Sequence, residues 1–83
     1  MDKKDVEAKV LQTVSNVMPE IDVENIDMSA ELVVAYGVDS VSIIQLIVEL
    51  EKEFNIEFDD TELALGLYYD MNDIVAAVMR KMN

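Results

Sequence analysis

Residues 39–55 read DSVSIIQLIVELEKEFN, and this stretch decides the fold class. Its apolar residues recur at helical spacing, which predicts an amphipathic helix from Ser40 to Phe54. Asp39 suits the N-cap position, because its carboxylate can accept from free backbone N–H groups and lies at the positive end of the helix dipole. Asn55 suits the left-handed position that ends many helices. This is the most clearly defined helix of the chain.

Projected at about 100° per residue, this helix has two apolar arcs instead of one. The first arc predicts the side chains that enter the core. The second arc is more than a small bundle easily buries, so it predicts a docking surface for other proteins, unless a neighbouring helix or the long loop covers it. The core arc consists of Ile43, Leu46, Ile47, Leu50 and Phe54, and the second arc consists of Val41, Ile44 and Val48.

Two further helices flank this segment. The first is predicted from Asp5 to Met18, where Pro19 stops it because the residue before a proline avoids α geometry. The last is predicted to follow Asp70, which caps it. The apolar face of the first helix consists of Val6, Val10, Leu11, Val14, Val17 and Met18, and that of the last helix consists of Ile74, Val75, Val78 and Met82.

The connecting segments are less regular. Residues 19–38 lack sustained periodicity and predict a long loop pinned by single apolar residues, with a short helical turn near Ala30 to Val34. Such loops are uncommon in compact domains and are often functional. Residues 56–58 predict an extended connector.

A short helix is predicted to start at residues 59–62 and to end near Gly66. The elements together predict an all-α fold: a small four-helix bundle with three main helices and one short helix, in a single domain over residues 1–83. The leucines expected to anchor the short helix are Leu63, Leu65 and Leu67.

The composition excludes several kinds of catalytic and binding site. The 83 residues include no Cys and no His. This excludes disulfides, thiol nucleophiles and Ser-His-Asp triads, and it removes most zinc sites. The two glycines stand alone, so no phosphate-cradling loop is present. From composition alone, an ordinary hydrolytic enzyme is therefore not expected.

The charge is strongly acidic and uneven. Eighteen Asp and Glu against six Lys and Arg give a net charge of -12, and residues 20–62 contain 13 of the acids and one base, Lys52. Such a chain is repelled by nucleic acid and by anionic membranes, and it favours partners with basic docking surfaces. No apolar run approaches the roughly 20 residues that span a bilayer. A soluble, cytoplasmic protein is the expectation.

The acidic middle also raises the hypothesis of calcium binding, but the spacing does not support it. An EF-hand loop needs oxygen ligands at positions 1, 3 and 5 and Gly at position 6. Counting from Asp22, position 3 is Glu24, but position 5 is Ile26 and position 6 is Asp27. No metal site is predicted, and only weak, diffuse binding of divalent ions stays possible.

The segment Gly37-Val38-Asp39-Ser40-Val41 leads into the long helix. Gly37 allows a sharp turn and Asp39 caps the helix. Ser40 then takes the first helical position, with its hydroxyl at the rim and no base beside it. On this pattern alone, Ser40 is either functional or an incidental small residue at a helix start.

This segment, residues 47–58 (IVELEKEFNIEF) and the order of elements resemble the acyl carrier protein family over essentially the whole chain. In that family the serine of an Asp-Ser-Leu motif carries 4′-phosphopantetheine, and the matching residue is Ser40, preceded by Asp39. The resemblance implies that a phosphopantetheinyl transferase attaches this arm to Ser40 and that Asp39, beside the attachment residue, helps the transferase recognise the site. The arm would supply the reactive thiol that the Cys-free chain lacks.

The chain departs from the family pattern at several positions. Val41 and Tyr36 stand where Leu is usual, and Asn55 replaces a helix-ending Gly. Ser42 and Gln45 are uncharged in a segment that fatty-acid-type carriers often make acidic. These two residues tilt the expectation slightly away from housekeeping fatty-acid synthesis.

The resemblance implies a standalone carrier that shuttles acyl thioesters between enzymes of fatty-acid or polyketide-type biosynthesis. Such a carrier is not itself an enzyme, and no catalytic residues are expected. The alternatives are a D-alanyl or other aminoacyl carrier, an unmodified acidic helical adaptor and a metal-responsive acidic protein. The expected partners are acyl-loading and acyl-processing enzymes, and a monomer suits such a shuttle. The expected docking residues are Val41, Ile44, Val48 and Glu51; if acyl chains are sequestered, the residues expected to line the space are Ile43, Leu46, Ile47 and Leu50.

Overall fold

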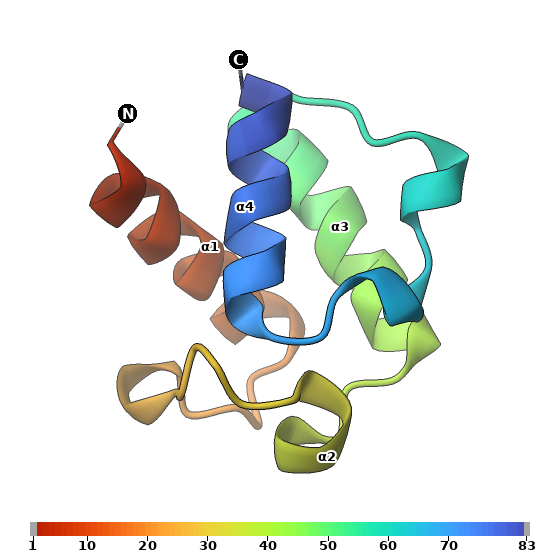
Figure 1. Ribbon diagram of the computed structural model, residues 1–83. Coiled ribbons are helices and arrows are strands. Elements are labelled where there is room, and N and C mark those ends of the chain that lie inside the picture. The colour runs from red at the N-terminus through yellow and green to blue at the C-terminus, as the bar shows by residue number, and fades with distance from the viewer. Residues whose placement is uncertain (1, 83) are drawn as a thin grey trace.

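The computed structural model describes residues 2–82 (Figure 1), which form no β-strand and no helix that is long and apolar enough to cross a bilayer. Helix α3 (Ser40–Phe54) has the predicted bounds. The side chain of Asp39 caps its start, and Asn55 ends it in the left-handed conformation with φ 54° and ψ 51°. The prediction for this helix is confirmed at both ends.

Helix α1 (Lys3–Val17) begins and ends earlier than the predicted range, which was Asp5 to Met18. Its cap is Asp2, whose Oδ1 accepts from the backbone N–H of Asp5 at 3.0 Å. The first residues of α1 are exposed. Hydrophobic periodicity detects a helix only where it buries a face, so it could not locate this start.

Helix α4 (Met71–Met82) follows Asp70, whose Oδ1 accepts from the backbone N–H of Asp73 at 2.9 Å. The predicted cap is therefore confirmed. Of the predicted apolar face, only Met82 is exposed. The prediction for Met82 is wrong because the fully buried face of α4 ends at Val78, one turn before Met82.

The short α-helix does not lie where it was predicted. Helix α2 (Leu32–Tyr36) forms in the loop before α3, close to the turn expected near Ala30 to Val34. Residues 59–66 form no α-helix. The 3-10 turns are η1 (Val23–Asn25), η2 (Asp60–Glu62) and η3 (Leu65–Leu67).

The spacing of the leucines explains this correction. Leu63, Leu65 and Leu67 are two residues apart, whereas an α-helix brings residues three and four apart to one face. Ala64 is extended, with φ -109° and ψ 128°, and separates η2 from η3. Leu63 and Leu65 pack against the core, but Leu67 is exposed and is not an anchor.

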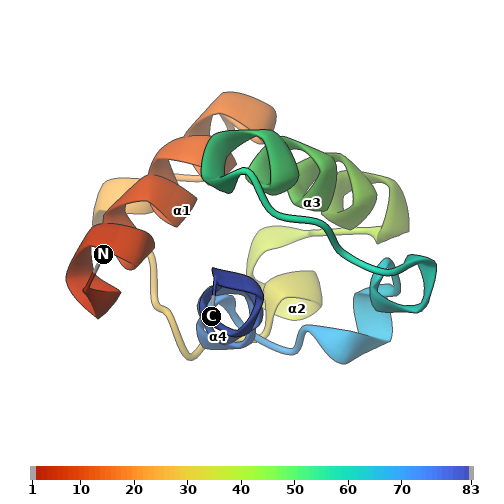
Figure 2. The same cartoon turned by 90° about the horizontal axis from the view of Figure 1, so that it is seen from above.

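The three long helices pack around one core. Helix α1 packs against α3 and α4, and α3 contacts α4. Figure 2 shows α1 and α3 in one layer with α4 beneath them. The predicted core arc of α3 is fully buried except for Phe54, which is partly buried. The fold is therefore a small helical bundle, as predicted.

Candidate functional site

A short turn places the start of α3 beside α2. Gly37 adopts the left-handed conformation with φ 65°, which glycine tolerates because it has no Cβ. Its N–H donates to the carbonyl of Val33 at 3.1 Å, and the N–H of Val38 donates to the carbonyl of Leu32 at 3.2 Å. The Val38 side chain is buried in the core. Backbone hydrogen bonds thus hold the turn against α2, and the Val38 side chain anchors it in the core.

Asp39 and Ser40 take the positions that the sequence predicts. The Oδ1 atom of Asp39 accepts from the backbone N–H of Ser42 at 2.8 Å. Hydrogen bonds from Ser42 hold the pKa of the Asp39 carboxyl below its usual value of 3.8. Ser40 is the first residue of α3, and it is exposed. The Asp39 carboxylate therefore caps the helix, while the neighbouring Ser40 is accessible to solvent.

The surroundings of Ser40 suit a hydroxyl that receives a group and do not suit a catalytic nucleophile. The chain has no His, and a carboxylate with a lowered pKa, such as that of Asp39, is a weak base. The first backbone N–H groups of a helix have no acceptor within the helix, and the positive end of the dipole favours an anion. An anionic group on the Ser40 oxygen would therefore be stabilised.

Long-range hydrogen bonds hold the segments around this turn. The Tyr36 hydroxyl accepts from the backbone N–H of Asp27 at 2.8 Å. The backbone N–H of Leu32 donates to the carbonyl of Tyr69 at 2.9 Å, which joins α2 to the segment before α4. The sequence marks Tyr36 only as a departure from a family pattern. No local signal pairs it with Asp27, so sequence reasoning missed this contact.

The second apolar arc of α3 is open to solvent. Val41, Ile44 and Val48 are 62%, 41% and 38% exposed, respectively. Ile44 and Val48 line a groove between α3 and the end of α1, to which Val17 also contributes. Within residues 2–82, α1 borders this groove and still leaves all three side chains at least 38% exposed. The surface that docking requires is therefore present, and its use by a partner stays a prediction.

Glu51, the fourth expected docking residue, has a structural contact that the sequence did not indicate. It is half-buried, and its Oε2 accepts from the backbone N–H of Phe58 at 2.8 Å. The contact fixes the extended connector that leaves α3. One carboxylate oxygen thus holds the fold, and the docking role of Glu51 stays a prediction.

Comparison of the sequence with known proteins identifies the family. The chain matches the family described as "Phosphopantetheine attachment site" over residues 8–78. It is 30% identical over 76 residues to the "Acyl carrier protein" of Desulforapulum autotrophicum, a match that covers 92% of this chain and 96% of that relative. The chain belongs to the acyl carrier protein family. The resemblance seen in the sequence is confirmed.

As an acyl carrier protein, the chain has a covalently attached 4′-phosphopantetheine as its prosthetic group, and it works with a phosphopantetheinyl transferase and with biosynthetic enzymes. Members of this family carry acyl groups and do not act as catalysts. The residues at the start of α3 fit the group, because an exposed hydroxyl lies at a helix N-terminus that stabilises a phosphodiester.

Proposed function

We propose that Ser40 is the residue to which 4′-phosphopantetheine is attached, and that this carrier shuttles acyl intermediates between enzymes of fatty-acid or polyketide-type biosynthesis. One observation carries the assignment: Ser40 is exposed at the first position of α3, within the family match over residues 8–78. The attached arm supplies a thiol for thioester formation, which this Cys-free chain lacks.

The chain itself positions the hydroxyl and leaves its activation to the transferase. The Asp39 carboxylate is held by Ser42, and its lowered pKa makes it a poor acceptor for the Ser40 proton. A base of the transferase therefore takes this proton as the Ser40 oxygen bonds to the pantetheine-bearing phosphorus of coenzyme A. The bond from that phosphorus to the bridging oxygen of the pyrophosphate breaks, and adenosine 3′,5′-bisphosphate leaves. Afterwards, the helix dipole stabilises the negative charge of the phosphodiester.

The attachment is tested by incubating the protein with a phosphopantetheinyl transferase, coenzyme A and Mg²⁺ and by measuring its intact mass. We expect a gain of one phosphopantetheine, which Ser40→Ala abolishes. Ser42→Ala is the matched control, because it removes a hydroxyl two residues away, and it should still gain the mass. Failure of several broad-specificity transferases to modify the wild type, or modification of Ser40→Ala, would contradict the assignment.

Docking of partner enzymes is proposed for the exposed arc of α3. Val41, Ile44 and Val48 offer apolar contact area close to Ser40. Glu49 lines the groove beside Ile44 and Val48, and residues 20–62 contain 13 of the 18 acids of the chain. Partners with basic surfaces would be attracted and oriented by this charge. Their complexes should be short-lived, because a shuttle has to leave each enzyme.

A further inference from the structure

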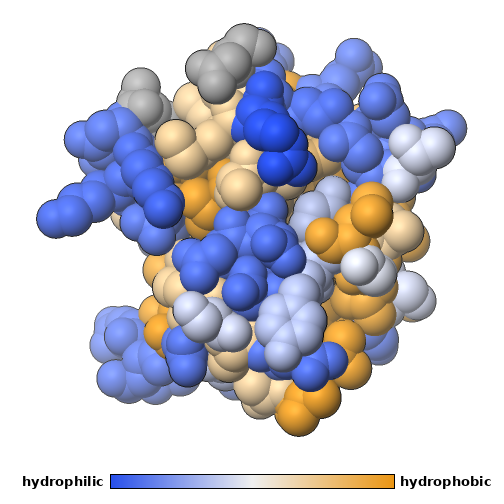
Figure 3. Space-filling model, in the orientation of Figure 1, coloured by the Kyte–Doolittle hydropathy of each residue, from blue (hydrophilic) through white to orange (hydrophobic). Residues whose placement is uncertain are grey.

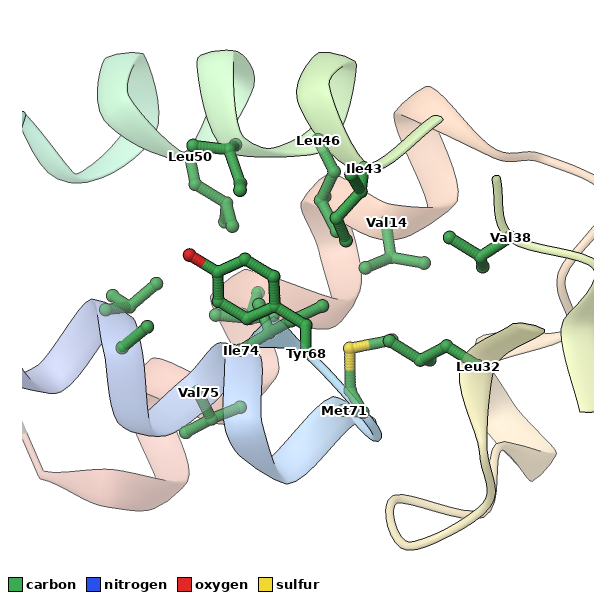
Figure 4. Close-up of a cluster of buried hydrophobic side chains, with 14 of the residues drawn as sticks. Val14, Leu32, Val38, Ile43, Leu46, Leu50, Tyr68, Met71, Ile74 and Val75 are labelled. Carbon is green, nitrogen blue, oxygen red and sulfur yellow. The ribbon is translucent and has the colours of Figure 1, made fainter. Parts of the chain in front are cut away.

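Tyr68 fills the space between α3 and α4. It follows η3 as its C-cap residue, and its side chain is 5% exposed. Figure 4 shows its ring pointing into the bundle, between Leu46 and Leu50 of α3 and Ile74 of α4. These three neighbours are completely or almost completely buried. The ring is therefore part of a close-packed interior.

Hydrogen bonds hold the ring in this position. The Tyr68 hydroxyl donates to the carbonyl of Glu62 at 2.7 Å. Next to it, the carbonyl of Tyr69 accepts from the N–H of Leu32 at 2.9 Å, and the N–H of Tyr69 donates to Oδ2 of Asp73 at 2.8 Å. The backbone on the C-terminal side of Tyr68 is thus tied to α2 and α4. If the ring swung outward, Tyr68 would lose the hydrogen bond to Glu62 and its contacts in the interior.

Tyr68 also contributes to a groove on the outside of the bundle. This groove lies between α2 and η3, on a side where hydrophobic residues gather at the surface (Figure 3). η3 lies against α3, the helix that Ser40 opens. Tyr68 therefore stands between this outer groove and the space between α3 and α4. The groove is lined by Glu31, Val33, Leu65, Gly66, Tyr68 and Tyr69.

We propose that Tyr68 closes the interior of the bundle to the cargo, so that an acyl group carried on the arm stays outside, at the groove between α2 and η3. This inference rests on the proposed attachment at Ser40. It answers the question of sequestration: Leu46 and Leu50, which were expected to line an acyl space, face the Tyr68 ring instead (Figure 4). The space that a chain would enter is already filled.

The cargo class follows from this closure. An alkyl chain that stays outside the bundle leaves part of its apolar surface in contact with water, and this surface grows with each methylene. For short or polar acyl groups, contact with water costs little free energy. The geometry therefore favours short or polar acyl groups over long saturated chains.

The wild-type protein gives the first test. It is loaded with octanoyl-phosphopantetheine by a transferase from octanoyl-coenzyme A, and loading is verified by mass. Nuclear Overhauser effects are then measured between the octanoyl methylenes and the methyl groups of Leu46 and Ile74. We expect none, together with equal melting temperatures for the octanoyl and unacylated forms. Strong effects to both side chains would overturn the proposal, whatever the variants show.

Two substitutions separate the ring from the hydroxyl. Tyr68→Ala removes the ring and should let the octanoyl chain enter, so that the octanoyl form melts several degrees higher than the unacylated form and its thioester reacts several-fold more slowly with hydroxylamine. Tyr68→Phe keeps the ring and should behave like the wild type. If Tyr68→Ala does not fold, Tyr68→Val replaces it. A folded small-residue variant that gains no protection would overturn the proposal.

The same variants separate this inference from the attachment at Ser40. If no transferase adds mass to the wild type, the proposed function fails, and the role of Tyr68 is then decided with unattached octan-1-ol. Folded Tyr68→Ala, or Tyr68→Val in its place, should bind this probe in the interior, as seen from Overhauser effects to Leu46 and Ile74, and the wild type should not. Interior binding to the wild type, or to neither protein, would contradict the closure by Tyr68.

Discussion

Two adjacent residues at the start of α3 have different roles in the proposed site: one caps the helix and the other presents a hydroxyl. The Asp39 side chain turns toward the helix and accepts from the N–H of Ser42, while Ser40 stays exposed. The two roles depend on each other, because the cap fixes the first turn on which the hydroxyl is presented. A change at Asp39 should therefore disturb the position of Ser40 without touching its chemistry.

The pKa of Asp39 makes the cap sensitive to pH. Its pKa in the folded protein lies below the usual value of 3.8, so the ionised carboxylate stabilises the fold above that pH, and this contribution is lost as pH falls through the folded-state pKa. Asp39→Asn keeps a capping oxygen but does not titrate. We expect the wild type to be more stable than Asp39→Asn at pH 6, and the difference to shrink below pH 4.

Urea unfolding measured at several pH values checks this expectation. Asp60→Asn, at another exposed position, is the control for the loss of one negative charge from an acidic chain. A difference between wild type and Asp39→Asn that stays constant down to pH 3, or that matches the Asp60→Asn difference throughout, would show that the cap does not contribute through its charge.

At the scale of elements, local signals gave both ends of α3, but they predicted a short α-helix where the structure has the 3-10 turns η2 and η3. The caps and the core arc of α3 all occur within residues 39–55, so one stretch of sequence contains the information. Helix α2 and the two turns after Phe58 depend on distant partners, such as the hydrogen bond from Leu32 to Tyr69. The sequence singles out Ser40 because the motif around it is local. The buried position of Tyr68 has no such local signal, because its neighbours come from α3 and α4 (Figure 4).

The two arcs of α3 predict opposite effects of substitution. Val48→Glu changes a partly exposed residue, so we expect a change in stability of no more than about 0.5 kcal/mol. The charge would enter the proposed docking arc and raise the KM of the transferase several-fold. Leu50→Ala changes a fully buried residue and should cost about 2–5 kcal/mol while the docking arc stays intact.

Thermal unfolding and transferase kinetics, measured on both variants, distinguish these effects. Far-UV circular dichroism confirms that each variant is folded at the assay temperature. If Val48→Glu unfolds many degrees earlier than the wild type, Val48 belongs to the core. If it is stable and its transferase kinetics are unchanged, this arc does not dock the transferase.

At the scale of the whole molecule, only a few of the acidic side chains in residues 2–82 form ion pairs. The net charge is -12, and the ion pairs in the described residues 2–82 use Lys52 with Glu49 and Lys81 with Glu62 and Asp59. Both bases lie at exposed or partly exposed positions. Repulsion among the remaining acids therefore acts on the folded protein more than these few attractions do.

This imbalance predicts that added salt stabilises the protein. Raising the ionic strength from about 0.15 M to about 1 M shortens the screening length from about 8 Å to about 3 Å, which weakens the repulsion between acids. We expect the melting temperature to rise steadily with NaCl, even though the exposed ion pairs also weaken. The magnitude should scale with ionic strength and should not saturate at low concentration.

The identity of the cation separates screening from a true metal site. Within residues 2–82, no group of three or more acidic side chains is placed to hold a metal ion. A chelating site would distinguish Ca²⁺ from Mg²⁺, because Mg²⁺ requires a smaller and more regular octahedron of oxygens. We therefore expect CaCl₂ and MgCl₂ at equal concentrations to raise the melting temperature equally. A rise that saturates with one Ca²⁺ per chain, and that Mg²⁺ does not reproduce, would instead support the metal-responsive alternative.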